Sequence, residues 1–349
     1  MRESGFWRGM FLDKRRRHRE RKKCFQKRFF GFKQQRKPDS ANAGRKYSYA
    51  NRTEHDTQII QHVLPLSYGY RQDTIICMVE ICNQRVGVFD SGLGGLFTLR
   101  ALARELPVYD YVYLGDTKRV PYGNRSPETV YEFTRQAVEY LFSKQKCKLV
   151  ILACNTASAL ALRRLQQEFL PSHFPDRHLL GVLVPLAETM REMGCRRVGV
   201  LATQSTIESH AIEHELKKRI SRVMVFERSA PLLVPLIENG ELRLARGALV
   251  SYLKPLIQEN VDCLALGCTH YPILKRLVKQ MVGKNVAVVS QDEFLGAKLI
   301  DYLGRHSDVE QSLSRRRRRV IIVTDKTREF KKRASMWFGK DITLQVINL

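Results

Sequence analysis

Two segments of the chain repeat one pattern, and each carries a cysteine at the same place. Residues 148–156 read KLVILACNT and residues 262–270 read DCLALGCTH, so that Cys154 and Cys268 occupy matching positions. A short apolar run bounded by polar residues is typical of a buried parallel strand. The sequence therefore predicts two tandem α/β units, each with one thiol at the carboxyl end of a strand.

The repeat extends upstream of each cysteine. Arg-Val-Gly-Val occurs at 85–88, where its last valine is 66 residues before Cys154, and again at 197–200, where its last valine is 68 residues before Cys268. Open α/β sheets place their ligands at the carboxyl ends of strands, so we expect the two thiols to face each other across a cleft. Two facing thiols suit a racemisation, in which a base removes a proton from one face of a carbon and an acid returns one to the other face.

Strand and helix patterns alternate from residue 85 onward, which predicts parallel sheets joined by crossover helices. The expected strands are 85–90, 111–115, 148–153, 181–184, 197–202, 223–226, 262–267, 285–290 and 319–324. The expected helices include 127–145, 156–170, 205–219, 241–259 and 272–282. Ser126 followed by Pro127 is a good helix start, with serine as the cap and proline at the first helical position.

We therefore expect an α/β fold of two tandem pseudo-symmetric domains with mainly parallel sheets and an active site in the cleft between them. The first domain would consist of residues 85–180 plus 288–349, and the second of residues 181–287. Residues 305–318 resemble an exposed linker. A final strand–helix–strand pattern follows it, with Phe330, Trp337 and Phe338 as its core anchors.

Residues 1–84 are strongly basic and show no such alternation before Met78. Residues 1–77 hold 19 Lys and Arg against 7 Asp and Glu, in a chain whose formal net charge is +25. The dense run Lys14–Lys23 could neutralise phosphates, so a nucleic-acid-binding protein is an alternative of a different class. A block of like charge is more typical of a disordered tail. We expect a disordered or non-native extension and no nucleic-acid partner.

The chain's eight cysteines form no CxxC pair, and eight in 349 residues are too few for a disulfide scaffold. This pattern favours free thiols in a reducing cytoplasm. No apolar run is long enough to span a bilayer and the basic N-terminus lacks the apolar core of a signal peptide, so we expect no membrane partner.

A glycine-rich turn, Asp90-Ser91-Gly92-Leu93-Gly94-Gly95, follows the first expected strand. It is a weak match to a dinucleotide fingerprint, because Phe97 stands where a third glycine allows close helix–strand packing. We expect its backbone N–H groups, at a helix N-terminus, to attract a carboxylate while Asp90 and Ser91 face the cleft. A plain helix cap made by Asp90 or Ser91 is the structural alternative.

Both candidate cysteines precede helices, and a helix N-terminus lowers the pKa of a thiol from its usual value of about 8.5. Each is expected to serve as a base near neutral pH, although a single cysteine is more often a small buried hydrophobe. His270 is two residues from Cys268 and could assist it, or serve as a hydrogen-bonded structural residue. His210 and His214 lie on a charged helical segment and are expected at the surface.

The chain resembles the bacterial glutamate racemases of the cofactor-independent aspartate/glutamate racemase superfamily, from about Val86 to its C-terminus. The motifs that carry the resemblance are VFDSGLGG at 88–95, YLGDT at 113–117, VPYG at 120–123, ACNTAS at 153–158 and GCTHYP at 267–272. Two positions differ from the family pattern. Ala202 replaces a usual glycine, and the segment at 289–292 reads VSQD where many members have an Asp-Ser or Asp-Pro pair.

The resemblance implies that Cys154 and Cys268 are the acid/base pair, supported by Asp90 and His270. It implies that Cys154 takes the proton from D-glutamate and Cys268 from L-glutamate. The residues implied to bind glutamate are Asp90, Ser91, Tyr122, Gly123, Asn155, Thr156, Thr203, Thr206, Glu238, Thr269 and His270.

The reaction implied is the interconversion of L- and D-glutamate without pyridoxal phosphate or metal, which supplies D-glutamate for peptidoglycan in the cytoplasm. The expected partner is the small-molecule substrate, with a homodimer as an open possibility. A racemase of the same superfamily that acts on aspartate or another amino acid is the nearest alternative.

Overall fold

The computed structural model describes residues 83–339 and 343–349. The predicted basic extension therefore lies outside the described residues, apart from Asn83 and Gln84, and so do Cys24, Cys77 and Cys82. Within the described residues, no helix combines the length and apolar character that a membrane crossing requires.

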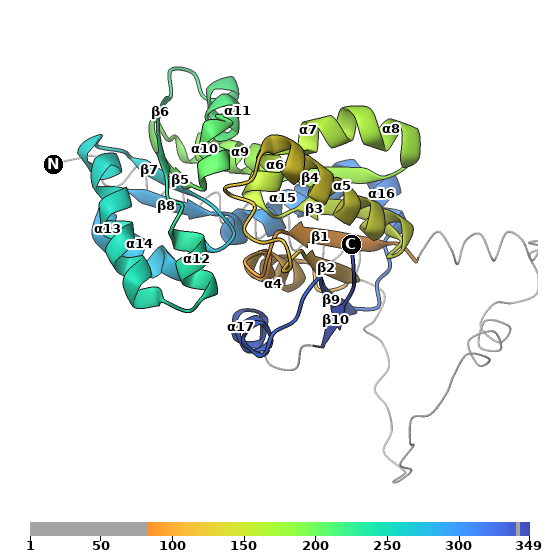
Figure 1. The fold of residues 1–349 in the computed structure, drawn as a ribbon. Coiled ribbons are helices and arrows are strands. Elements are labelled where there is room, and N and C mark those ends of the chain that lie inside the picture. Colours follow the sequence, from red (N-terminus) through yellow and green to blue (C-terminus); the bar gives the residue numbers. More distant parts are fainter. Residues whose placement is uncertain (1–82, 340–342) are drawn as a thin grey trace, which may run out of the picture. The chain divides into compact units, whose positions relative to one another are not determined.

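Two fully parallel sheets form the core of the described chain (Figure 1). The first has the order β10-β9-β2-β1-β3-β4, with bounds β1 (Arg85–Asp90), β2 (Tyr111–Gly115), β3 (Cys147–Leu152), β4 (His178–Gly181), β9 (Arg319–Val323) and β10 (Leu344–Val346). The second has the order β6-β5-β7-β8, with bounds β5 (Arg197–Ala202), β6 (Met224–Ser229), β7 (Cys263–Gly267) and β8 (Ala287–Ser290). The predicted α/β class with parallel sheets is confirmed.

The two sheets share one strand order, since β2-β1-β3-β4 matches β6-β5-β7-β8. Val88 pairs with Ile151 in the first sheet, and Val200 pairs with Ala265 in the second. Cys154 lies three residues beyond the first pairing partner, and Cys268 lies three residues beyond the second. The repeat found in the sequence is thus a repeat of structure, and the two cysteines are equivalent within it.

Helices connect the strands and cover the sheets. Their bounds are α4 (Gly95–Glu105), α5 (Pro127–Ser143), α6 (Asn155–Leu160), α7 (Leu162–Arg164), η1 (Leu165–Phe169), α8 (Leu170–His173), α9 (Leu183–Met193), α10 (Gln204–Glu208), α11 (Ala211–Arg219), α12 (Leu233–Glu238), α13 (Leu242–Gln258), η2 (Tyr271–Leu274), α14 (Lys275–Val282), α15 (Gln291–Arg305), α16 (Ser307–Ser312) and α17 (Arg328–Phe338). Helix α5 begins as predicted, because the Ser126 side chain accepts a hydrogen bond from the Thr129 N–H and Pro127 follows it.

Alternation of side chains along the first sheet divides the helices between its faces. Val112 and Leu114 join the buried cluster under α5 and α6. Tyr111 points the other way, and its hydroxyl donates to the carbonyls of Leu102 and Leu106 at the end of α4. Helix α4 in turn contacts α15 and α17. With both faces covered by helices, the carboxyl ends of the strands remain to form a site.

Several predicted segments differ from the structure, among them the helix expected at 205–219, which is divided into α10 and α11. The strand expected at 181–184 runs earlier, from His178 to Gly181, because α9 begins at Leu183. The segment expected to be an exposed linker contains α16 and buries Val309 and Leu313, so the prediction is wrong for 309–314. Residues 315–318 are exposed, as predicted. The helix expected at 156–170 is a succession of α6, α7 and the π-helical turn η1, which ends at Phe169.

The final strand–helix–strand pattern is confirmed as β9, α17 and β10. Trp337 is buried there as predicted, whereas Phe330 and Phe338 are only partly buried. His210 and His214 are exposed, as predicted.

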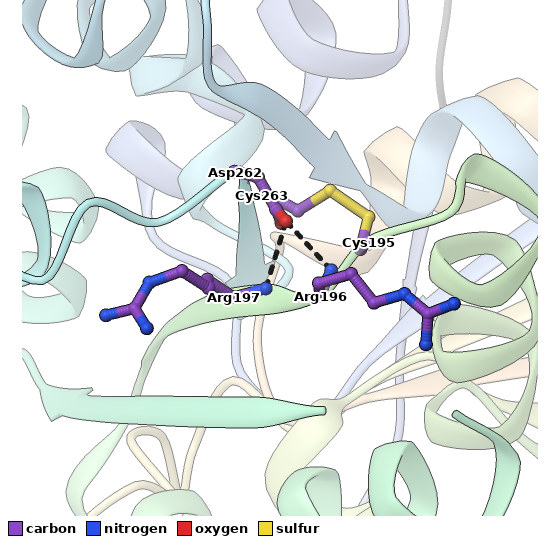
Figure 2. The surroundings of a disulfide bond; sticks show 5 residues. All are labelled: Cys195, Arg196, Arg197, Asp262 and Cys263. Carbon is purple, nitrogen blue, oxygen red and sulfur yellow. Dashed lines mark hydrogen bonds between the residues drawn. A yellow bond between two sulfur atoms is a disulfide. The ribbon is translucent and has the colours of Figure 1, made fainter. Parts of the chain in front are cut away.

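A disulfide joins Cys195 to Cys263, so the prediction of free thiols is wrong for this pair (Figure 2). The Cα atoms are 5.9 Å apart because Cys263 begins β7 and pairs with Val198 of β5, just after Cys195. The Asp262 carboxylate accepts hydrogen bonds from the backbone N–H groups of Arg196 and Arg197, which fixes the same corner. Cys147, Cys154 and Cys268 are free and buried.

Candidate active site

The two equivalent cysteines line one pocket at the carboxyl ends of the strands. Cys154 follows β3 and caps α6, and Cys268 follows β7. The pocket is lined by Ser91, Pro121, Tyr122, Gly123, Asn124, Cys154, Asn155, Thr156, Thr203, Pro231, Val234, Cys268, Thr269 and His270. Its free volume is about 20 Å³. On the same scale one water molecule needs about 10–15 Å³, so the pocket has room for little more than one water. The pocket is therefore closed and must widen to admit a molecule the size of an amino acid.

Cys154 lies at the start of α6 but is protonated at neutral pH. Its sulfur accepts from the Ala157 N–H at 3.5 Å and donates to the Ser91 hydroxyl at 3.5 Å. Burial raises the pKa of Cys154 to about 12, and the nearby Asp90 carboxylate adds to the increase. The predicted lowering of this pKa is wrong, because loss of solvent in the closed pocket outweighs the helix terminus and both hydrogen bonds.

Cys268 has a different neighbour, the imidazole of His270. The Nδ1 atom of His270 is 3.7 Å from the Cys268 sulfur, and its Nε2 atom is 2.5 Å from a carboxylate oxygen of Glu238. Burial alone would lower the pKa of His270, but the Glu238 carboxylate and the Cys268 sulfur raise it well above its usual value. Burial likewise favours a neutral Glu238, yet the charge of His270 lowers the Glu238 pKa below its usual value. A charged His270 can thus donate a hydrogen bond to a thiolate at Cys268.

The backbone N–H groups of the glycine-rich turn, which were expected to attract a ligand carboxylate, bind the side chain of Asp90. The backbone N–H groups of Gly92 and Gly95 donate to one oxygen of Asp90, at 3.1 Å and 3.0 Å. Asp90 is fully buried and is not among the residues that line the pocket, so the expectation that it faces the cleft stays a prediction. Burial raises the pKa of Asp90, although His270 and both N–H donors favour the ionised form.

The turn needs glycine at Gly94 because the two halves of the site meet there. A Cβ atom at this position would lie 2.6 Å from the Thr269 hydroxyl oxygen and 2.7 Å from Nδ1 of His270. Only a residue without a side chain lets α4 begin so close to the loop that carries Cys268.

Most of the residues expected to bind substrate lie together. Ser91, Tyr122, Gly123, Asn155, Thr156, Thr203 and Thr269 line the pocket with the two cysteines and His270. The hydroxyl oxygens of Thr156, Thr203 and Thr206 lie 2.8–3.1 Å apart, which places Thr206 directly behind the lining. Glu238 is not a lining residue, but its carboxylate is hydrogen-bonded to His270, which is.

Two further buried residues hold lining side chains in place. Gln291 accepts a hydrogen bond from the Asn155 amide at 2.9 Å and donates to Thr98 and to the Ala153 carbonyl. Asp116 accepts from the Tyr122 hydroxyl at 2.5 Å. The sequence contained both signals, Asp116 in a motif and Gln291 at a departure from the family pattern, but it gave neither residue a role.

Two groups of described residues could offer three metal ligands, and neither lines the pocket. Cys195, Asp262 and Cys263 form one, in which the two sulfurs are already bonded to each other. His210, Glu213 and Glu227 form the other at the surface, where His210 lies 2.6 Å from Glu227 and Lys217 pairs with Glu213.

Comparison with known proteins agrees with this arrangement. A family model described as Asp/Glu/Hydantoin racemase matches residues 97–291. Glutamate racemase from Dinoroseobacter shibae is 42% identical over 237 residues, which cover 64% of this chain and 85% of that protein.

The solved structure of glutamate racemase isoform RacE1 from Bacillus anthracis is 31% identical, with a TM-score of 0.69 over 76% of this chain and 98% of that one. The enzyme from Francisella tularensis, solved with D-glutamate, is 28% identical, with a TM-score of 0.68 over the same shares. With the matched model spanning both cysteine-bearing halves of the sequence repeat, this chain belongs to the Asp/Glu/hydantoin racemase family.

Proposed function

We propose that this chain interconverts L- and D-glutamate by proton transfer between substrate and two thiols, and thereby supplies D-glutamate for peptidoglycan in the cytoplasm. One observation carries the proposal: Cys154 and Cys268 stand at equivalent strand ends of two sheets and line the same pocket. The glutamate racemases similar to this chain make glutamate the substrate of choice over aspartate.

In the proposed reaction, a thiolate on one side removes the α-proton of glutamate and becomes a thiol. The thiol on the other side gives its proton to the opposite face of the α-carbon and becomes a thiolate. The hydroxyl and amide groups of the lining, among them Ser91, Asn155 and Thr269, can donate hydrogen bonds to the substrate carboxylates. Such donors stabilise the negative charge that develops on the carboxylate beside the α-carbon.

The two thiols have unlike neighbours in this reaction. Cys154 is a thiol in the closed pocket, so it is ready to act as the acid. The charged His270 lies 3.7 Å from the Cys268 sulfur and can donate a hydrogen bond to it when Cys268 acts as the base. In the other direction Cys154 must act as the base. The positive ammonium group of the substrate would then offset the charge of Asp90 and favour deprotonation of the Cys154 thiol.

Circular dichroism of the purified protein with each enantiomer of glutamate and aspartate tests the proposal. Racemisation of glutamate is expected, unaffected by EDTA or by hydroxylamine, because the thiols alone carry the proton transfers. Cys154→Ser and Cys268→Ser should each lower the rate by ~10²–10⁴-fold in both directions, since general acid–base catalysis is typically worth that much. Activity on aspartate alone, or a variant that racemises at the wild-type rate, would overturn the assignment.

The same proposal includes two domains, residues 85–180 plus 288–349 and residues 181–287. The pairing of the strands into two separate sheets supports two domains. The last strand of the second sheet, β8, ends at Ser290, so it extends past the proposed boundary at residue 287. A homodimer stays a prediction that sedimentation velocity can test.

A further inference from the structure

Helix α17 brings an aromatic side chain against the histidine of the site. Trp337 is 3% exposed, and its ring centroid lies 6.1 Å from that of His270 with an interplanar angle of 86°, an edge contact. On its other side, Trp337 stacks on Phe97 of α4 at 5.3 Å. Phe97 belongs to the first turn of α4, whose Gly95 N–H donates to the carboxylate of Asp90 at the end of β1, so Trp337 packs on the helix that begins beside Asp90.

The orientation of the His270 ring decides whether it can serve Cys268. Its Nε2 atom lies 2.5 Å from a carboxylate oxygen of Glu238, and its Nδ1 atom lies 3.3 Å from the Thr269 hydroxyl oxygen and 3.7 Å from the Cys268 sulfur. A rotation of the ring about its bond to Cβ would lengthen the contact with Cys268, which is already long. Trp337 limits that rotation, since His270 is 1% exposed and the indole occupies the space beside it.

We infer that Trp337 is a positioning residue for one of the two thiols: its edge contact holds the His270 imidazole where it reaches Cys268. The inference rests on the proposed two-thiol reaction and adds to it a role for the C-terminal helix. Cys154 has other neighbours, the Ser91 hydroxyl and the Ala157 N–H, so α17 serves one face of the substrate and not the other.

A second residue of α17 acts on the same group. The side chain of Arg333 is 12% exposed and lies 3.6 Å from Glu329, one turn earlier on the helix. Burial raises the pKa of Glu238, but His270, the Leu93 N–H and Arg333 together lower it. Arg333 thus favours the ionised Glu238 that holds the other nitrogen of His270.

Racemisation uses both thiols in each direction, so it cannot separate their roles. A β-chloroglutamate enantiomer can do so, because removal of its α-proton by one thiolate forms the Cα–Cβ double bond and expels chloride in a single step. Cys154→Ser and Cys268→Ser in the full chain first show which enantiomer each thiol deprotonates. The variants of Trp337 are then measured with both enantiomers.

Trp337→Leu should slow chloride release from the enantiomer that Cys268 deprotonates by about 2- to 10-fold, the range expected for loss of one aromatic contact. Release from the other enantiomer should keep its wild-type kcat. Trp337→Phe should restore the first rate, because it keeps a ring edge against His270. Trp337→Met provides a second aliphatic variant, with the same one-sided loss, should the leucine variant not melt cooperatively.

Phe142→Leu is the matched control, since Phe142 is 2% exposed and its ring lies 5.3 Å from that of Phe174 in a tilted contact, within the core of the first sheet. It should leave the ratio of the two elimination rates unchanged. Equal slowing of both enantiomers by Trp337→Leu, or no slowing of either, would overturn the positioning role. Failure of the wild type to racemise glutamate would instead overturn the proposed function.

Discussion

Reduction of the Cys195–Cys263 bond should destabilise the protein by an amount that follows from its place in the chain. The bond closes a loop with a sequence separation of 68 residues. In the chain-entropy account, a loop of that size removes about 15 cal/mol/K from the unfolded state, or about 4 kcal/mol at 25 °C. At roughly 2–4 °C per kcal/mol for a domain of this size, the melting temperature should fall by roughly 8–16 °C.

Calorimetry of the oxidised and reduced wild type measures this change without altering any side chain. Intact mass and thiol titration in denaturant should show two more thiols in the reduced sample. Cys195→Ala is the control, because its melting temperature should not respond to the reductant. A wild type that gains two thiols on reduction and melts at the same temperature would refute the entropic reasoning.

Three other outcomes are expected. Gly94→Ala should lower kcat by about tenfold or more by pushing against Thr269 and His270, whereas Gly247→Ala in α13, where a Cβ meets nothing within 4 Å, should keep activity and gain up to about 1 kcal/mol of stability. His270 has a raised pKa, so its stabilisation is complete below its ordinary value of 6.5 and is lost as pH rises through the raised value. Glu238 has a lowered pKa, so its stabilisation is present above 4.5 and is lost as pH falls through the lowered value. His270→Gln should therefore cost more unfolding free energy in urea at about pH 5.5 than at about pH 9, and equal costs would contradict the ion pair. A chain that begins at Met78 should keep full racemase activity and a cooperative melt, and loss of either would show that residues 1–77 shape the enzyme.

The strands and the two thiols could be predicted from sequence because their signals are local. An apolar run that ends in a small residue and a cysteine defines both the strand and the position at its carboxyl end, as for Cys154 after β3. The internal repeat also related two residues that are far apart in the sequence, because it placed Cys154 and Cys268 at equivalent positions.

What could not be predicted depends on how distant segments meet. Cys195 and Cys263 are 68 residues apart, and only the pairing of β5 with β7 brings them together. The contact of Trp337 with His270 likewise requires the C-terminal helix to return to α4. The pKa of Cys154 was mispredicted for a related reason, since a helix terminus is visible in sequence and the closure of the pocket over the thiol is not.

The unlike surroundings of the two thiols have a consequence for what steady-state kinetics can show. L- and D-glutamate are mirror images, so they have identical free energies in water and their equilibrium constant is unity. The ratio kcat/KM must then be the same in both directions for the wild type and for every variant. Because His270 lies on one side and the Ser91 hydroxyl on the other, kcat and KM can each differ between the two enantiomers as long as their ratio stays equal. These neighbours therefore cannot make the enzyme accumulate either enantiomer. Net production of D-glutamate has to come from a reaction that consumes it.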